Sequence, residues 1–395
     1  MGQTSPRSVL VYRLSAFLLV LAACGGDETT SSTAPVDTTA PTSDPTSSDT
    51  DTDPTETPSD TDTPSSGDTS ATGDTSDTGT PVDTRPRLLD SCEVTLPLDH
   101  GTLCVLRPSV LDPGARDEAG TSVLDARIGY GWHVVAIPDE PRADHPMWVH
   151  IGGSYGRPYD QDNGNVRGGL WMDELMAEGF LVLQPAYDNR FAVNDSCSPN
   201  QPGFEEDNCA GNVREEVLTG DDLTDLRETP LQDAMEHRMA VLTQHLAAHQ
   251  GVTLPAALDP AAPDWSLLSV SGHSQGGNLA YYIARFRGVV FGCMLAAPYD
   301  YHDAVDPSFP FIADWFTEGT PLTPVEQLGQ LITTEDDAAD AFRSAGALIG
   351  LEAGVQAFEV SAPPYTNVTG EELDGHAAAL SDPDLAADRA AACLR

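Results

Sequence analysis

The chain has 395 residues, and its 62 acidic and 19 basic side chains give it a formal net charge of −43. Every basic residue of that count is arginine, because the sequence contains no lysine. So strong a negative charge argues against nucleic acids and anionic membrane surfaces as partners, since both would be repelled.

The first 24 residues predict export. Arg7 and Arg13 precede a short apolar run over 14–21, which ends in the small residues of LAAC at 21–24. A basic start, a short apolar stretch and small residues are typical of a secretory signal peptide, and the run is shorter than the about 20 residues that span a bilayer. LAAC resembles a bacterial lipobox, which implies lipidation of Cys24. The alternative is an ordinary signal peptide in which Cys24 is incidental.

Residues 25–84 consist almost wholly of Thr, Ser, Asp, Pro and Gly. Such a segment cannot bury apolar surface, so we expect it to be disordered, and its prolines and carboxylates favour extended conformations. We therefore predict a tether between a lipid anchor and one folded domain over 85–395, which places the protein in the cell envelope or at the cell surface.

Strands and helices alternate in the pattern of the folded part. Apolar runs predict strands at 132–137, 147–151, 181–187, 267–271, 289–297, 328–333 and 355–360, with helices at 169–179, 231–250, 278–286 and 385–394. This alternation predicts an α/β fold with a mainly parallel, doubly wound sheet covered on both faces.

Two long segments, 188–226 and 298–326, follow predicted strands on one side of that sheet. Ligands of open α/β sheets bind at the carboxyl ends of the strands, so we expect these segments to form walls of a substrate site. The second segment contributes the large apolar side chains Phe309, Phe311, Ile312, Trp315 and Phe316.

The motif Gly272-His273-Ser274-Gln275-Gly276 lies between the apolar run 267–271 and the helical pattern 278–286. A serine in G-x-S-x-G between strand and helix is typical of a nucleophile elbow, whose tight turn requires glycines on either side. The alternative is a structural Gly/Ser-rich turn. With this motif in this position, residues 120–395 resemble the α/β-hydrolase superfamily.

That resemblance implies a catalytic order of Ser274, then an acid, then a histidine. Two histidines follow the serine, His302 and His376. His302 has only Asp300 available between itself and the serine, two residues away, which is too near to orient it. We therefore predict that His376, in a loop after the last strand, is the base.

The acid is expected at the carboxyl end of the strand before the last one, where 328–333 runs into Thr334-Glu335-Asp336-Asp337. We predict Asp336, with Asp337 and Glu335 as alternatives. Asp300, at the end of the preceding strand, is the main rival.

Acyl transfer also needs fixed N–H donors for the developing oxyanion. The backbone N–H of Gln275, directly after the nucleophile, is one predicted donor. The segment WVHIGGS at 148–154 resembles the H-G-G-G loop of lipases and esterases, although Ile151 replaces a glycine. This departure leaves the second donor open between Gly153 and Ser154.

Besides Cys24, the chain has six cysteines: Cys92, Cys104, Cys197, Cys209, Cys293 and Cys393. An even number in an exported chain suggests disulfides. The sequence neighbours Cys92–Cys104 and Cys197–Cys209 are the predicted pairs, with Cys293 and Cys393 either paired or both free and buried. We predict no metal site, because there is no C-x-x-C, and His245 and His249 lack the glutamate of H-E-x-x-H.

These patterns together predict a serine hydrolase that cleaves small or polymeric carboxylic esters through an acyl-enzyme, without a cofactor. Activity should rise as His376 loses its proton, near the ordinary histidine pKa of about 6.5. A peptidase, lipase or acyltransferase would use the same residues. A different class, a non-catalytic surface lipoprotein for binding or adhesion, stays open, and so does the oligomeric state.

Overall fold

The computed structural model describes residues 83–117, 129–142, 147–197, 208–252, 254, 263–300 and 313–395. They belong to one compact unit, Asp77–Arg395. The predicted signal peptide, Cys24 and the linker up to residue 82 lie outside the described residues. So do His302, Phe309, Phe311 and Ile312.

A nine-stranded sheet has the order β1-β2-β3-β7-β4-β8-β9-β10-β11. Its strands are β1 (Val94–Leu98), β2 (Gly101–Leu106), β3 (His133–Pro138), β4 (Met147–Ile151), β7 (Val182–Gln184), β8 (Leu268–His273), β9 (Phe291–Leu295), β10 (Leu328–Thr333) and β11 (Ala357–Val360). From β7 to β11 all neighbours are parallel, whereas β1, β2, β3 and β7 pair antiparallel. The predicted fold class, α/β with a mainly parallel sheet, is confirmed.

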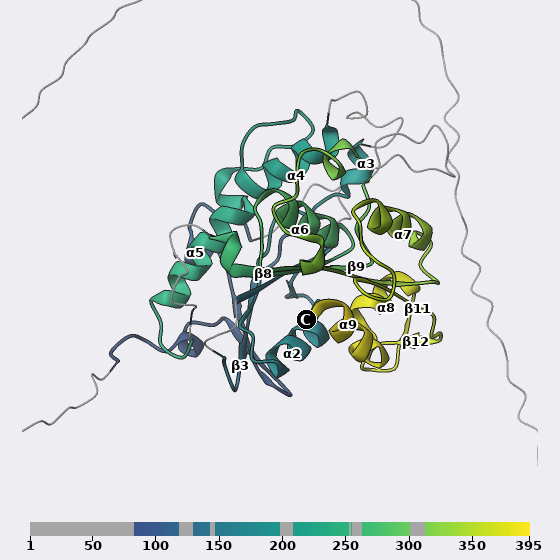
Figure 1. Cartoon of the computed structure of the whole chain (residues 1–395). Helices are drawn as coiled ribbons and strands as arrows, with labels where there is room; N and C mark the ends of the chain where they lie inside the picture. Colours follow the sequence, from purple (N-terminus) through teal and green to yellow (C-terminus); the bar gives the residue numbers. More distant parts are fainter. Residues whose placement is uncertain are drawn as a thin grey trace, which may run out of the picture. The chain divides into compact units, whose positions relative to one another are not determined.

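Helices cover both faces of this sheet: α4, α5 and α6 lie on one side, and α2 and α9 on the other (Figure 1). The helices of the described residues are α1 (Pro108–Leu111), α2 (Gly169–Ala177), α3 (Val193–Cys197), α4 (Cys209–Thr219), α5 (Met235–Ala247), α6 (Gln275–Phe286), α7 (Ala339–Leu348), α8 (Gly375–Ser381) and α9 (Ala386–Cys393). Both faces of the central strands β4, β8, β9 and β10 are therefore removed from water, whereas the edge strand β1 is only half-buried.

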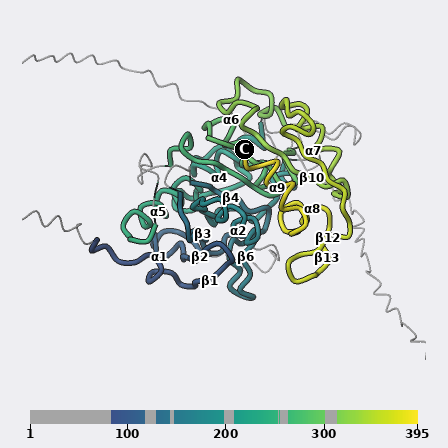
Figure 2. Tube along the Cα trace, turned by 60° about the horizontal axis from the view of Figure 1, so that its bottom comes forward, coloured from purple at the N-terminus to yellow at the C-terminus, as the bar shows by residue number. Residues whose placement is uncertain are grey.

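Two small hairpins complete the described elements. β5 (Tyr159–Asp160) pairs with β6 (Asn165–Val166), and β12 (Tyr365–Thr366) pairs with β13 (Glu372–Leu373). Figure 2 shows the second hairpin close to α8, which contacts both of its strands.

Alternating side chains of β4 explain why the sheet needs cover on both faces. Met147 and Val149 belong to the core beneath α5 and α6, whereas Trp148 between them packs with Trp171 of α2 on the opposite face. Successive side chains of a strand point to opposite faces, so a strand that is apolar throughout is stable only between two layers. No helix among the described residues is long and apolar enough to cross a membrane.

The structure corrects three sequence-based expectations about elements. The β1–β2 hairpin was not predicted. The predicted helix 231–250 begins with a separate turn, Leu231–Asp233, and α5 ends at Ala247. The segment 188–226, expected to be polar and turn-rich, contains α3 and α4. A disulfide fastens the first residue of α4, Cys209, and the helix buries Val213, Val217 and Leu218 in the core.

The six cysteines of the folded part form three disulfides: Cys92–Cys104, Cys197–Cys209 and Cys293–Cys393. The third closes a separation of 100 residues and fastens α9 to the central strand β9. A long closed loop restricts the unfolded chain more than a short one, so this bond constrains the unfolded state most.

Candidate active site

Ser274 occupies a strained turn between β8 and α6. Its φ of 58° and ψ of −125° lie where side chains are rarely found. The turn is possible because backbones approach closely on either side: a Cβ at Gly272 would lie 2.0 Å from the carbonyl oxygen of Gly276, and one at Gly276 would lie 2.1 Å from that of Ile151. The sharp bend lifts the serine side chain to the carboxyl end of β8.

His376 and Ser274 line the same cavity, which has a volume of about 170 Å³. The sequence predicted that this histidine lies in a loop, and that prediction is wrong. His376 is the second residue of α8, whose first turn is capped by the Asp374 side chain. Its Nδ1 lies 2.7 Å from Oδ2 of Asp336. The carboxylate therefore orients the ring, and Nε2 is the nitrogen left for the serine.

Asp336 has the charge that this arrangement requires. Burial raises the pKa of its carboxyl, but hydrogen bonds from His376 and from the Ala338 backbone N–H outweigh that effect, and the pKa is lowered. Thr333 at the end of β10 donates to the carbonyl oxygen of Gly375, which ties the Asp336 turn to the start of α8.

The other acids considered from the sequence have different partners or surroundings. Glu335 accepts hydrogen bonds from Tyr365 and Ser361, and the hydrogen bond from Tyr365 is the main cause that lowers its pKa to about 2. Asp337 is exposed. Neither side chain takes the place that Asp336 has beside His376.

Asp300, the main rival, is buried in an ion pair with Arg214. The Arg214 Nε donates to Oδ2 of Asp300 at 2.5 Å, and the indole N–H of Trp315 donates to the same oxygen at 3.1 Å. Both charged side chains are almost inaccessible and line the Ser274 cavity. Asp300 is therefore part of the cavity wall, and the structure places it against Arg214 and not against His376.

The predicted oxyanion donors lie around Ser274. Gln275 is the first residue of α6, so its N–H has no acceptor within the helix. This N–H lies at the positive end of the helix dipole. Gly153 packs against Ser274, with a built Cβ only 3.2 Å from that of the serine. Ser154 donates its hydroxyl to the Gln275 side chain at 3.0 Å, which joins the two turns.

A buried asparagine holds the second turn in place. Asn189 donates from Nδ2 to the carbonyl oxygens of Gly153 and Gly156, at 2.7 and 2.6 Å. These bonds satisfy two backbone carbonyls and fix the direction of the peptide units between them. The bond to Gly153 fixes the peptide unit that carries the Ser154 N–H. The Tyr187 hydroxyl donates to the carbonyl oxygen of Gly152 at 2.7 Å, which fixes the unit that carries the Gly153 N–H. Fixed N–H groups of this kind are what an oxyanion site would need.

Sequence reasoning missed His273, which occupies a variable position of the motif. Its Nε2 lies 2.8 Å from the backbone carbonyl oxygen of His376. A carbonyl only accepts, so Nε2 carries the hydrogen. Burial, with a smaller contribution from His376, lowers the His273 pKa to about 4, so the ring is neutral near pH 7. His273 fixes the backbone of the candidate base, and no sequence pattern announces that contact.

The two predicted wall segments contribute unequally. The first supplies Ala192, Val193, Asn194 and Arg214 to the cavity. The second supplies Tyr299 and Asp300, but Trp315 and Phe316 pack against Tyr281 of α6 in the core. The expectation of an aromatic wall is wrong for these two residues because α6 needs apolar cover on its outer face.

Among the described residues, no group of three or more His, Cys, Asp or Glu side chains could hold a metal ion. The rings of His245 and His249 lie 4.2 Å apart, but His245 Nε2 contacts the Ser91 hydroxyl and His249 Nδ1 contacts the carbonyl oxygen of His245.

No family model matches the sequence, and no curated protein is similar to it. The fold is similar to that of a feruloyl esterase module from Clostridium thermocellum complexed with sinapinate, with 11% identity, a TM-score of 0.33 and coverage of 68% of this chain and 82% of that one. A ferulic acid esterase from Anaeromyces mucronatus in complex with ferulic acid gives 13% identity, a TM-score of 0.32 and coverage of 73% and 93%. Esterase 2 of Thermogutta terrifontis gives 12% identity, a TM-score of 0.30 and coverage of 63% of this chain and 83% of that one. Scores this low carry no functional conclusion, which has to come from the geometry of the site.

Proposed function

We propose that this chain is a serine hydrolase that cleaves carboxylic esters through an acyl-enzyme. The observation that carries the proposal is the Asp336–His376 hydrogen bond of 2.7 Å at the cavity that Ser274 lines from its strained turn. A serine hydroxyl becomes nucleophilic when an oriented imidazole removes its proton, and these three side chains are suited to that role.

In the proposed reaction, Ser274 Oγ forms a bond to the ester carbonyl carbon while its proton passes to Nε2 of His376. The negative charge on the carbonyl oxygen is held by N–H groups of Gln275 and of Gly153 or Ser154. Each such donor is worth about 3–4 kcal/mol of barrier. Collapse breaks the bond to the alcohol oxygen, which takes the proton from His376. Water then attacks the acyl-enzyme by the same route.

The cavity favours a short acyl group. Its volume of about 170 Å³ lies below the about 300–1,000 Å³ of sites for drug-sized ligands. Its described wall includes the Arg214–Asp300 ion pair and the amides of Asn194 and Asn278. Long alkyl chains gain little from burial against such polar groups, so we propose acetyl or propionyl esters as the substrates.

Fluorophosphonate labelling and a p-nitrophenyl ester series test this proposal. We expect labelling of the wild type, loss of labelling in Ser274→Ala, and falling kcat/KM from acetate to octanoate. A folded wild type that neither labels nor hydrolyses any ester would favour a non-catalytic binding protein. Labelling with cleavage of peptides but not of esters would instead assign a peptidase. Transfer of the acyl group to an added alcohol in preference to water would assign an acyltransferase.

We also propose export as a lipoprotein with its lipid on Cys24, which the LAAC segment supports. Labelling of the full chain with a clickable palmitate in a bacterial host tests it. Label should be incorporated by the wild type and lost in Cys24→Ala. A labelled Cys24→Ala chain would overturn the assignment.

A further inference from the structure

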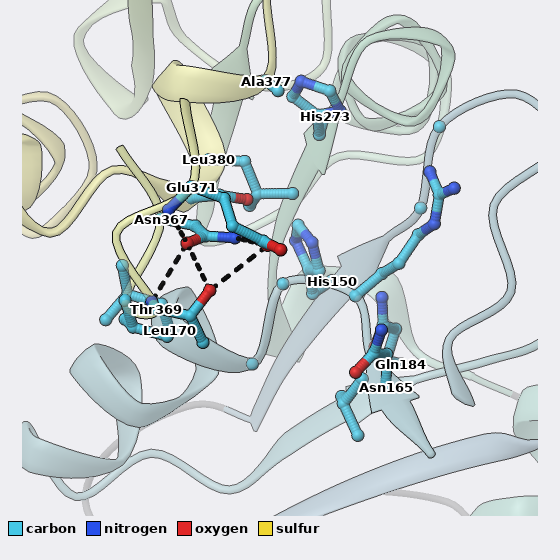
Figure 3. A pocket seen from close by; sticks show the side chains of 18 residues that line it. His150, Asn165, Leu170, Gln184, His273, Asn367, Thr369, Glu371, Ala377 and Leu380 are labelled. Carbon is cyan, nitrogen blue, oxygen red and sulfur yellow. Dashed lines mark hydrogen bonds between the residues drawn. The ribbon is translucent and has the colours of Figure 1, made fainter. Parts of the chain in front are cut away.

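A second cavity lies near the carboxyl ends of β4 and β7 and is lined by His150 and Gln184 (Figure 3). It has a volume of about 390 Å³ and is bordered by Gly152, Gly153 and His273. The next residues of the same two turns, Ser154 and Ser274, face the smaller cavity. The β5–β6 hairpin, the start of α2, the β12–β13 turn and α8 supply its remaining sides. We call it the His150 cavity.

His150 presents a hydrogen-bond donor to this cavity. The Ser271 hydroxyl oxygen accepts from the indole N–H groups of Trp148 and Trp171, at 2.8 and 3.0 Å, and lies 3.0 Å from Nδ1 of His150. Two donors fill the lone pairs of that oxygen, so its own hydrogen goes to His150. Nδ1 is therefore the acceptor of the ring, and Nε2 carries the hydrogen.

This donor has no hydrogen-bond partner in the part of the chain that the structure describes. His150 is completely buried, and burial, aided by His273, lowers its pKa to about 3, so the ring is neutral near pH 7. Its Nε2 is one of the buried atoms without a hydrogen bond among the described residues. An unsatisfied buried N–H costs about 1–3 kcal/mol, so an acceptor supplied from outside would stabilise the site.

Gln184 adds a second unsatisfied group. It is the last residue of β7, is completely inaccessible, and lines the cavity with His150. Neither its amide nitrogen nor its amide oxygen has a hydrogen-bond partner among the described residues. The cavity therefore offers both donors and an acceptor from rigid strand positions, and Figure 3 shows both side chains at it.

The entrance combines polar and apolar groups. Asn367, Thr369 and Glu371 form a hydrogen-bonded cluster at the β12–β13 turn. Arg167 also borders the cavity, with the apolar side chains of Leu170 and Leu380. The two charged side chains that line the cavity, Glu371 and Arg167, have opposite signs, so they favour neither an anionic nor a cationic ligand. The net charge of −43 further disfavours an anion.

We propose that the His150 cavity binds a neutral, hydroxyl-rich ligand the size of a monosaccharide. A sugar hydroxyl both donates and accepts, as the Gln184 amide and the His150 N–H require. Its C–H faces suit the apolar side chains. The volume lies within the range of small-molecule sites. This ligand site does not depend on ester hydrolysis at Ser274.

Titration of the purified full chain with glucose, galactose, xylose and arabinose tests this site, by saturation-transfer NMR and calorimetry. We expect at least one sugar to saturate the wild type. Gln184→Leu should weaken that sugar about tenfold or more, since it loses two hydrogen bonds, and Ser274→Ala should bind as the wild type does. Equal binding by Gln184→Leu, or no saturation by any sugar, would overturn the proposal and leave a solvent-filled cavity.

Two further measurements keep the test decisive if Gln184→Leu does not fold. Glu371→Ala changes an exposed entrance residue and should weaken the same sugar several-fold. In histidine-labelled protein, the Nε2–H signal of His150 should be present and should shift on sugar addition. A signal that does not move, or an anionic sugar acid that binds more tightly than its neutral parent, would contradict the proposed ligand class.

Discussion

The Ser274 cavity and the His150 cavity differ in how their polar groups are satisfied. Around Ser274, Asp336 is paired with His376 and Asp300 with Arg214. In the His150 cavity, the His150 N–H and both amide atoms of Gln184 lack partners among the described residues. The two cavities are close together in the chain: Gly153 and His273 line the His150 cavity, and the residues that follow them, Ser154 and Ser274, line the other one.

This difference separates two kinds of site. Groups that act on a reacting atom must already be oriented by other protein groups, because reorientation during the reaction would raise the barrier. Groups that recognise a ligand are left unsatisfied, since the ligand completes their hydrogen bonds. Variants that change one cavity at a time test this distinction.

The largest effect is expected for Asp336→Asn. The amide cannot stabilise an imidazolium and favours the wrong ring tautomer, so kcat for p-nitrophenyl acetate should fall by about 10⁴-fold, while sugar binding in the His150 cavity persists. Asp337→Asn is the matched control, because that neighbour is exposed. Equal losses in both variants would show that the site does not distinguish the two acids.

Arg214→Met should give the largest loss of stability. It leaves Asp300 buried without its cation and so gives the Ser274 cavity an unsatisfied charge, which costs about 3–5 kcal/mol. Equilibrium unfolding in guanidinium chloride measures this loss. The control, Arg343→Met, removes the two ion pairs with Asp340 and Glu359, whose arginine is 49% exposed, and should cost less than about 1 kcal/mol. Similar losses of unfolding free energy in the two variants would contradict the larger contribution expected from the buried Arg214–Asp300 pair.

Stability should fall as the pH drops from about 6.5 toward 4. His150 and His273 have folded-state pKa values of about 3 and about 4, below the ordinary 6.5, so the unfolded chain binds protons first in that window. Each histidine contributes up to about 1.4 kcal/mol per pH unit. Urea unfolding at pH 7 and pH 5 measures the slope, which His150→Gln should reduce. An unchanged slope would contradict a buried neutral His150.

Ser154→Ala should have the smallest effect. It removes the hydroxyl donated to the Gln275 side chain, a bond worth about 0.5–1.5 kcal/mol, so kcat should fall about two- to tenfold. Ser344→Ala, which removes an exposed hydroxyl from α7, is the control. A drop of a thousandfold would mean that Ser154 does more than join the two turns.

The sequence by itself determined the fold class and the bounds of β4 and β10, because short apolar runs between turn residues carry strand information locally. The glycines flanking Ser274 predicted the turn, because a tight turn also depends on residues that are neighbours in the sequence. The β1–β2 hairpin was not predicted, because β1 is only half-buried and the apolar run of β2, 103–106, is short.

Only the tertiary structure decided which charged groups meet. Asp336 and Asp300 both follow strands at the same sheet edge, and nothing in their local sequences says that one contacts His376 and the other Arg214 from α4. The His273 contact to the His376 backbone and the unsatisfied Gln184 amide are equally invisible in sequence. Such contacts join residues far apart in the chain, and their geometry is set by packing of the whole domain.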